Sequence, residues 1–451
     1  MEEKRSSFTG RVGFVLAAAG SAVGLGNIWR FPYLAAKYGG GIFLLVYLIL
    51  ALTFGFALMT AEIALGRKTG KSAIEAYGSL NKKYSFIGYL SSLVPVIILP
   101  YYCVIGGWVV KYFVTFVCGQ ASAAAGSEYF NSFIGQTGQP AIWFLVFLGL
   151  TAIVVLLGVE KGVERVSKIL MPVLVVLSIV ICVYTICMPG ALEGVKYYFL
   201  PDFSKFSSMT VLAALGQLFY SMSLAMGIMI TYGSYMKKKD DLAKSVKQIE
   251  WFDTGIAFIA GLMIVPAVFV FSGGDQSALN AGPGLMFVTL PKVFDSMAFG
   301  GVIGAAFFLL VLFAALTSSI SLMETVVSIL QDKLKWNRTV STITVWAGSV
   351  LLGLLSSFGF SIWSEFKILG FSILDFFDFL SNSVLMPIVA LLTCIFVGYV
   401  IKTKTISDEV ELSGPFKRKK LFVVMIQYIA PIFIVAILIS SVLNSLGIIK
   451  I

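Results

Sequence analysis

The sequence predicts an all-α protein that crosses a membrane eleven times. Apolar residues make up 58% of the 451 residues, and charged residues make up only 12%. The apolar residues gather in runs of the length that a membrane-spanning helix needs, which is about 20 residues. We expect spans near residues 11–37, 41–66, 86–117, 141–158, 165–187, 209–236, 249–272, 299–332, 338–357, 368–401 and 420–447.

The basic residues test this assignment. Alternate connections between the spans hold 25 of the 33 lysines and arginines. Because cytoplasmic loops are enriched in these residues, we expect a multi-pass protein of the plasma (inner) membrane with its N-terminus in the cytoplasm. With eleven spans, the C-terminus then faces the extracellular or periplasmic side. Two longer outward segments, 193–206 and 275–296, predict short amphipathic elements that cover the outer mouth.

Several function classes are not expected. The chain has no histidine, and its five cysteines lie mostly within apolar runs without the spacing of a disulfide framework or a metal site. Neither a phosphate-binding GxxxxGK[ST] loop nor a nucleophile–base pair is present, so we expect no ATP-driven pump, no enzyme and no organic cofactor. The net charge of +10 fits the membrane orientation better than binding to nucleic acid.

The first span is interrupted at its centre. Residues 20–27 read GSAVGLGN, and Arg30 follows within the same apolar run. Each glycine costs a helix about 1 kcal/mol relative to alanine. One interpretation is a glycine-rich face for helix packing. The other is a binding site, because unpaired backbone groups inside a membrane need protein, water or a ligand as partners.

The sixth span repeats this feature. Residues 216–227 read GQLFYSMSLAMG, with small and hydroxyl side chains at midspan. If residues 11–187 and 209–401 form two halves and 420–447 an accessory helix, both interruptions fall in the first helix of a half. Such paired interruptions are typical of inverted-repeat transporters. They favour the binding interpretation, because free carbonyls suit Na⁺ and free amides suit a carboxylate.

These stretches resemble the neurotransmitter:sodium symporters. The resemblance rests on residues 20–47 (GSAVGLGNIWRFPYLAAKYGGGIFLLVY), 61–67 (AEIALGR), 216–227 and 315–321 (ALTSSIS), and it extends from residue 5 to about residue 400. Eleven helices resemble the bacterial amino-acid branch. The resemblance implies a five-plus-five inverted-repeat fold with discontinuous helices 1 and 6. It also implies sodium-coupled symport of an amino acid by alternating access.

The resemblance implies two sodium sites. The first would use the Ala22 carbonyl with the side chains of Asn27, Ser221 and Asp253. The second would use the carbonyls of Gly20, Val23 and Ala314 with the hydroxyls of Thr317 and Ser318. An alternative for the Thr-Ser-Ser run is helix packing or hydrogen bonding back to its own helix.

Asp253 departs from the chloride-dependent members of this family, which have asparagine there. The neighbours of the family's chloride site match Tyr47, Gln217 and Ser221. Our hypothesis is that the Asp253 carboxylate replaces chloride and makes transport chloride-independent. The alternative is that Asp253 belongs to a cytoplasmic loop, with its helix beginning at about Glu250.

A substrate site would lie at the same break. The substrate carboxylate would meet the Leu25 and Gly26 amides and the Tyr102 hydroxyl, and the ammonium group would meet carbonyls near Ser221. The full set carried over is Ala22, Gly24, Leu25, Gly26, Ile98, Tyr102, Tyr220, Ser221, Ser223, Met226, Ser318 and Leu322. None of these side chains is charged, so we expect a neutral, hydrophobic or aromatic amino acid, because an unpaired buried charge is costly.

Charged pairs match the family's gates. Arg30 would pair with Asp378 at the outer gate, with Asp375 as a competing partner one turn earlier. Arg5 would pair with Asp332 at the inner gate, where Phe8 replaces the usual tryptophan.

Two alternative functions stay open. One is a proton-coupled carrier of the same architecture that uses Glu62 or Asp253. The other is an amino-acid sensor without transport, or a channel. The sequence does not specify an oligomeric state.

Overall fold

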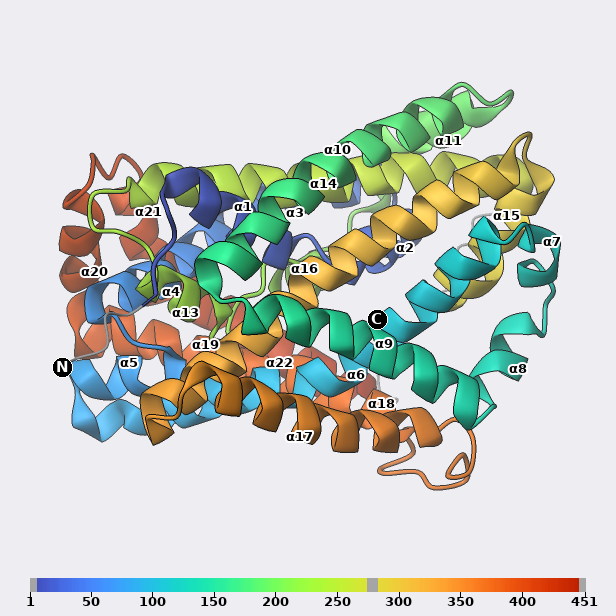
Figure 1. Cartoon of the computed structure of the whole chain (residues 1–451). Coiled ribbons are helices and arrows are strands. Elements are labelled where there is room, and N and C mark those ends of the chain that lie inside the picture. Colours follow the sequence, from blue (N-terminus) through green and yellow to red (C-terminus); the bar gives the residue numbers. More distant parts are fainter. Residues whose placement is uncertain (1–5, 274–282, 446–451) are drawn as a thin grey trace.

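The computed structural model describes residues 6–273 and 283–445. Within these residues the chain is helical almost throughout and forms no strand, with only two isolated bridges, Gly40 to Pro201 and Ile368 to Phe371. The long helices run in the same general direction and form one bundle (Figure 1).

Nine helical segments of the described chain are long and apolar enough to cross a membrane. They are α3–η2–α4 (Gly41–Leu50, Ala51–Gly55, Phe56–Thr69), η3–α6 (Lys82–Tyr84, Ser85–Val117), α9 (Gly138–Leu156), η4–α10 (Val159–Glu164, Arg165–Ile186), α14 (Leu242–Phe271), α16 (Gly300–Leu334), α17 (Arg338–Phe358), α18–η8–α19–η9 (Ile373–Asp378, Phe379–Leu385, Met386–Ile395, Phe396–Val400) and α21–η10–α22 (Lys419–Val424, Met425–Ile429, Ala430–Ser445). A broken helix within residues 11–37 brings these to ten, and a second broken helix lies within the predicted sixth span, residues 209–236.

The first broken helix confirms the interruption predicted at residues 20–27. Helix α1 (Arg11–Ala22) ends where Val23 becomes extended, and η1 (Gly26–Arg30) continues into α2 (Phe31–Lys37). The two halves bend by 55° at the break. The glycine motif therefore opens the backbone at the centre of the span.

The second broken helix lies at the predicted place in the sixth span. Helix α12 (Ser208–Ser221) and helix α13 (Ile228–Ser234) are separated by residues 222–227. Ser223, Ala225 and Gly227 have positive φ angles of 52°, 60° and 72°. Three left-handed residues in five cannot continue a right-handed helix, so the backbone is open here as well.

Short helices cover both ends of the bundle. Helices α5 (Ala73–Leu80) and α20 (Lys402–Glu411) lie with α13 at the left end of Figure 1, and α7 (Ala121–Ala124), α8 (Tyr129–Ile134) and α15 (Leu290–Ser296) lie at the right end. Helix α11 (Ala191–Phe199), with η5 (Phe203–Lys205), and η7 (Leu285–Thr289), with α15, confirm the short elements predicted within 193–206 and the described part of 275–296. Residues 274–282 of that segment lie outside the described residues.

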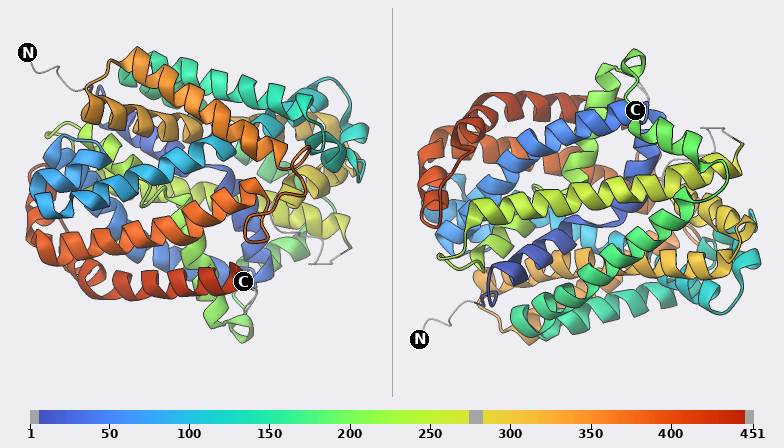
Figure 2. Two further views of the ribbon diagram at one scale, coloured as in Figure 1. Left: turned by 90° about the horizontal axis from the view of Figure 1, so that it is seen from below. Right: turned by 90° about the horizontal axis from the view of Figure 1, so that it is seen from above.

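The basic connections gather at one end of the bundle. The segments that carry α5 and α20, and the connection between α13 and α14, lie together at the left of Figure 1. We call this the basic end, and the opposite end the outer end. Viewed from below, the last helix (red) lies on the opposite side of the bundle from α17 (orange), as Figure 2 shows.

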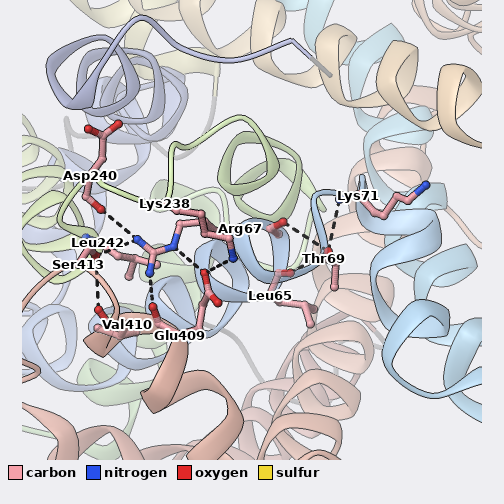
Figure 3. Close-up of polar contacts among 11 residues, drawn as sticks. Leu65, Arg67, Thr69, Lys71, Lys238, Asp240, Leu242, Glu409, Val410 and Ser413 are labelled. Atoms are coloured by element: carbon pink, nitrogen blue, oxygen red, sulfur yellow. Dashed lines mark hydrogen bonds and ion pairs between the residues drawn. The ribbon is translucent and has the colours of Figure 1, made fainter. Parts of the chain in front are cut away.

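A buried ion network ties the basic end together (Figure 3). Arg67, at the end of α4, contacts the Glu409 carboxylate of α20 at 2.9 Å, and both side chains are almost fully buried. Its guanidinium also donates to the Glu409 carbonyl, to the Asp240 carbonyl at 3.0 Å and to Ser413 Oγ at 2.9 Å. Helix α20 is thereby fixed to α4 and to the connection between α13 and α14.

Candidate functional site

A small cavity lies between the two helix breaks. Its volume is about 30 Å³, enough for a few water molecules but far below the size of ordinary ligand pockets. Most of the residues carried over for the substrate line it, namely Ala22, Gly24, Leu25, Gly26, Ile98, Tyr102, Tyr220, Ser223, Met226, Ser318 and Leu322. Ser221 lies beside the cavity, bonded to Asp253. Sequence reasoning missed three lining residues, Ser21, Ile228 and Ser321.

One wall of the cavity is backbone. The Leu25 amide donates to the Tyr102 hydroxyl at 3.4 Å. A Cβ atom at Gly24 would lie 2.8 Å from Ser318 Oγ and 3.2 Å from the Tyr102 hydroxyl, so a larger residue would push these two hydroxyls out of place. The amides here begin a helix that runs from Gly26 to Lys37. The start of a helix attracts an anion, so a carboxylate is the group that suits this wall.

Tyr220 separates this cavity from the outer end. Its ring packs directly on Gly26, where a Cβ atom would overlap the ring. On its other side the ring lies 5.5 Å from the Arg30 guanidinium. Tyr220 lines both the central cavity and an outer vestibule of about 360 Å³. Tyr220 therefore forms part of the wall between the vestibule and the central cavity.

The predicted first sodium site is brought together around Asp253. Its Oδ1 accepts hydrogen bonds from Asn27 Nδ2 at 2.8 Å and from Ser221 Oγ at 2.7 Å. Ala22 lines the cavity next to this group. The expectation that the helix of Asp253 begins at about Glu250 is wrong, because α14 begins at Leu242 and Asp253 is completely buried. The alternative that Asp253 lies in a cytoplasmic loop is therefore excluded.

Asp253 forms no ion pair with a lysine or an arginine among the described residues. Tyr47 donates to its Oδ2 at 3.4 Å. Gln217 donates to the Gly26 carbonyl at 2.9 Å, which places it beside this group. A buried, unpaired carboxylate is costly. A bound cation among these oxygens would therefore stabilise the site.

The residues predicted for the second sodium site also lie close together. Ser318 Oγ lies 3.4 Å from the Gly20 carbonyl and 3.5 Å from the Val23 carbonyl. Thr317 Oγ1 lies 3.1 Å from the Ala314 carbonyl. Thr317 thus shows the bond to its own helix that the alternative interpretation predicted, whereas Ser318 faces the break in helix 1. Hard cations such as Na⁺ prefer oxygen ligands of this kind.

The structure does not form the predicted outer ion pair. Among the described residues Arg30 has no ion pair within 4 Å, although Arg30, Asp375 and Asp378 all line the vestibule. Asp378 Oδ1 accepts from the Tyr101 hydroxyl at 3.2 Å and from Asn382 at 2.6 Å, and Asp375 accepts from Ser372 at 2.6 Å. In place of Arg30, each of the two carboxylates accepts hydrogen bonds from nearby residues.

At the basic end, the predicted partner Arg5 lies outside the described residues. Asp332 accepts a hydrogen bond from the Ser72 amide at 2.7 Å. Phe8 is completely buried against Phe14 and Tyr232, and its amide donates to the Tyr235 carbonyl at 3.2 Å. The N-terminal segment therefore packs into the bundle here even with phenylalanine in place of tryptophan.

Glu62 supports the break between α12 and α13. Its Oε1 accepts a hydrogen bond from the Ala225 amide at 2.7 Å, and its Oε2 has no hydrogen-bond partner among the described residues. The first contact anchors a left-handed residue of the break. Glu62 therefore has a structural role at this break.

Comparisons with known proteins fit this geometry. The model of the sodium:neurotransmitter symporter family matches residues 5–132 and 126–448. The chain belongs to this family. It is 34% identical to an uncharacterized sodium-dependent transporter of Bacillus subtilis, over 100% of this chain and 99% of the relative. It is also 25% identical to the human sodium- and chloride-dependent GABA transporter 2, over 90% of this chain and 75% of the relative.

A solved structure has the same fold. The crystal structure of MhsT in complex with L-phenylalanine has a TM-score of 0.87 to this chain and 38% identity, over 97% of this chain and 100% of that one. The five-plus-five inverted-repeat fold with discontinuous helices 1 and 6 is thus confirmed. The protein is a sodium-dependent, multi-pass membrane symporter of this family.

Proposed function

We propose that the protein imports a neutral, hydrophobic or aromatic amino acid together with two sodium ions by alternating access. Charged side chains do not line the central cavity in the described part of the chain, so a charged substrate side chain would find no partner there. The bound L-phenylalanine of the MhsT structure supports an apolar substrate.

The observation that carries the proposal is the buried Asp253 carboxylate beside the break in helix 1. Asn27 connects the two, because its Nδ2 contacts Asp253 while its Oδ1 accepts from the Gly24 amide at 3.3 Å. A sodium ion bound at Asp253 and Asn27 would therefore order the same backbone that meets the substrate carboxylate. This shared backbone gives a physical basis for coupling the ion to the substrate.

Chloride independence is part of the proposal. Tyr47 and Ser221 contact Asp253, and Gln217 bonds the carbonyl of Gly26 next to Asn27. A fixed negative charge therefore stands where the resemblance would place chloride. In the proposed orientation, the N-terminus lies in the cytoplasm, the C-terminus lies outside the plasma (inner) membrane, and the basic end faces the cytoplasm. At a membrane potential of 100 mV, two inward sodium ions contribute about 4.6 kcal/mol.

Uptake by the purified protein in proteoliposomes tests the function. We expect accumulation of radiolabelled phenylalanine when an inward sodium gradient and an inside-negative potential are imposed, with no change when gluconate replaces chloride. Accumulation driven by a pH gradient in sodium-free medium would instead support the proton-coupled carrier. Binding without uptake or counterflow would support the sensor.

A further inference from the structure

Three serines form a hydroxyl cluster in the wall of the central cavity. Ser21 is the second-last residue of α1, Ser223 lies in the break between α12 and α13, and Ser321 lies on α16. All three are buried and line the cavity. Ser21 Oγ lies 2.6 Å from Ser321 Oγ and 3.2 Å from Ser223 Oγ. We call Ser21, Ser223 and Ser321 the serine cluster. Ser21 and Ser321 were not among the site residues predicted from the sequence.

Each hydroxyl of the serine cluster already donates its proton to a hydrogen bond. Ser223 Oγ donates to the Ser21 carbonyl at 3.0 Å, and Ser321 Oγ donates to the Ser318 carbonyl at 2.8 Å. The remaining proton, on Ser21, serves a contact within the cluster. A hydroxyl has one donor but two acceptor positions. The Ser21 proton fills one of these acceptor positions, so most acceptor positions of the three oxygens remain unused.

The rest of the side-chain pocket is apolar, so these acceptors are its main polar feature. The side chains of Ile98, Met226 and Leu322 line the cavity with apolar surface. The Ser318 hydroxyl is turned toward carbonyls of the helix 1 break, with the Ser21 carbonyl at 3.1 Å. The serine cluster is therefore an acceptor-rich spot beside an otherwise apolar side-chain pocket. Ser321 lies one turn beyond Ser318 toward the basic end, on the side of the cavity away from the vestibule.

We propose that the serine cluster is a specificity subsite that favours neutral amino acids whose side chain ends in a hydrogen-bond donor. A phenol hydroxyl or an indole N–H would use the free acceptors. A side chain of the same shape without a donor would remove water from them without replacing it, and buried acceptors left unpaired are costly. The inference rests on the proposed function and adds the class of side chain that the site prefers.

Two matched ligand pairs test this on the purified protein in sodium buffer. Tyrosine differs from phenylalanine by one hydroxyl, and tryptophan differs from 3-benzothienylalanine by N–H replaced with sulfur. We expect the donor-bearing member of each pair to bind about two- to tenfold more tightly, the range of one net neutral hydrogen bond. Competition against a radiolabelled amino acid gives the ratio of dissociation constants for each pair.

Ser321→Ala should bring both ratios close to one, and Ser21→Ala is the substitute variant if Ser321→Ala does not fold. The matched control is Ser319→Ala, because Ser319 lies on the same helix but bonds Thr151 at 2.8 Å and is absent from the cavity lining. The control should keep the wild-type ratios. Equal or inverted ratios in the wild type, or ratios unchanged by Ser321→Ala, would overturn the subsite. If no ligand binds in sodium, the proposed function itself has failed.

Discussion

Asp253→Asn is expected to weaken sodium binding by about tenfold or more in chloride-free buffer. Two unit charges 4 Å apart interact by about 4 kcal/mol at an effective dielectric constant of 20, and desolvation offsets part of this. The asparagine oxygen can still accept the hydrogen bond of Ser221, which lies at 2.7 Å in the wild type, so the fold should survive. The measurement is a sodium titration of amino-acid binding, with and without chloride.

The variant should also regain affinity when chloride is added, because Tyr47, Gln217 and Ser221 remain in place around the lost charge. Asp295→Asn is the matched control, since Asp295 is exposed and bonded to Ser122 at the outer end. An Asp253→Asn protein with the wild-type sodium titration and no response to chloride would show that the carboxylate does not replace the anion.

Arg67→Ala is expected to destabilise the protein by about 3 kcal/mol, the lower end of the range for breaking a buried ion pair, because Glu409 keeps its contact with Lys238 at 2.7 Å. The side chains of Arg67 and Glu409 are 0% and 3% exposed, and the guanidinium makes several further bonds at the basic end. Arg67→Lys should recover only part of the loss, because an ammonium group cannot make the same planar set of bonds. Thermal unfolding in detergent measures the effect.

Lys196→Ala is the control for this loss, because Lys196 and Glu193 form an exposed pair that contributes little. The double variant Arg67→Ala/Lys238→Ala should be less stable than Arg67→Ala alone, since it removes both cations that contact the buried Glu409 carboxylate. A melting temperature of Arg67→Ala equal to that of Lys196→Ala would contradict the structural role of the network.

The backbone breaks could be predicted from the sequence because their cause is local. The glycines of residues 20–27 and the small residues of 216–227 weaken a helix wherever they occur, and α1 and α12 end within them. Apolar runs also located the other spans. The start of α14 was missed because Lys244, Lys247 and Glu250 interrupt its hydropathy, although the helix continues through them.

Contacts between segments far apart in the chain could not be predicted from the local sequence. Arg67 and Glu409 are 342 residues apart, and Ser21 and Ser321 are 300 residues apart. A serine in an apolar helix most often bonds its own backbone, so nothing in the sequence distinguishes Ser321 from Ser319. The resemblance to a family supplied the residues around Asp253, and it could not show that Arg30 lies over Tyr220 rather than beside an aspartate.

The central claim is that sodium and an amino acid bind together at the break in helix 1. The most direct measurement is the melting temperature of the purified protein with phenylalanine or tyrosine, at fixed pH and chloride, in sodium buffer and in potassium buffer. The account predicts that the amino acid raises the melting temperature in sodium and has little effect in potassium. An equal rise in both buffers would contradict it.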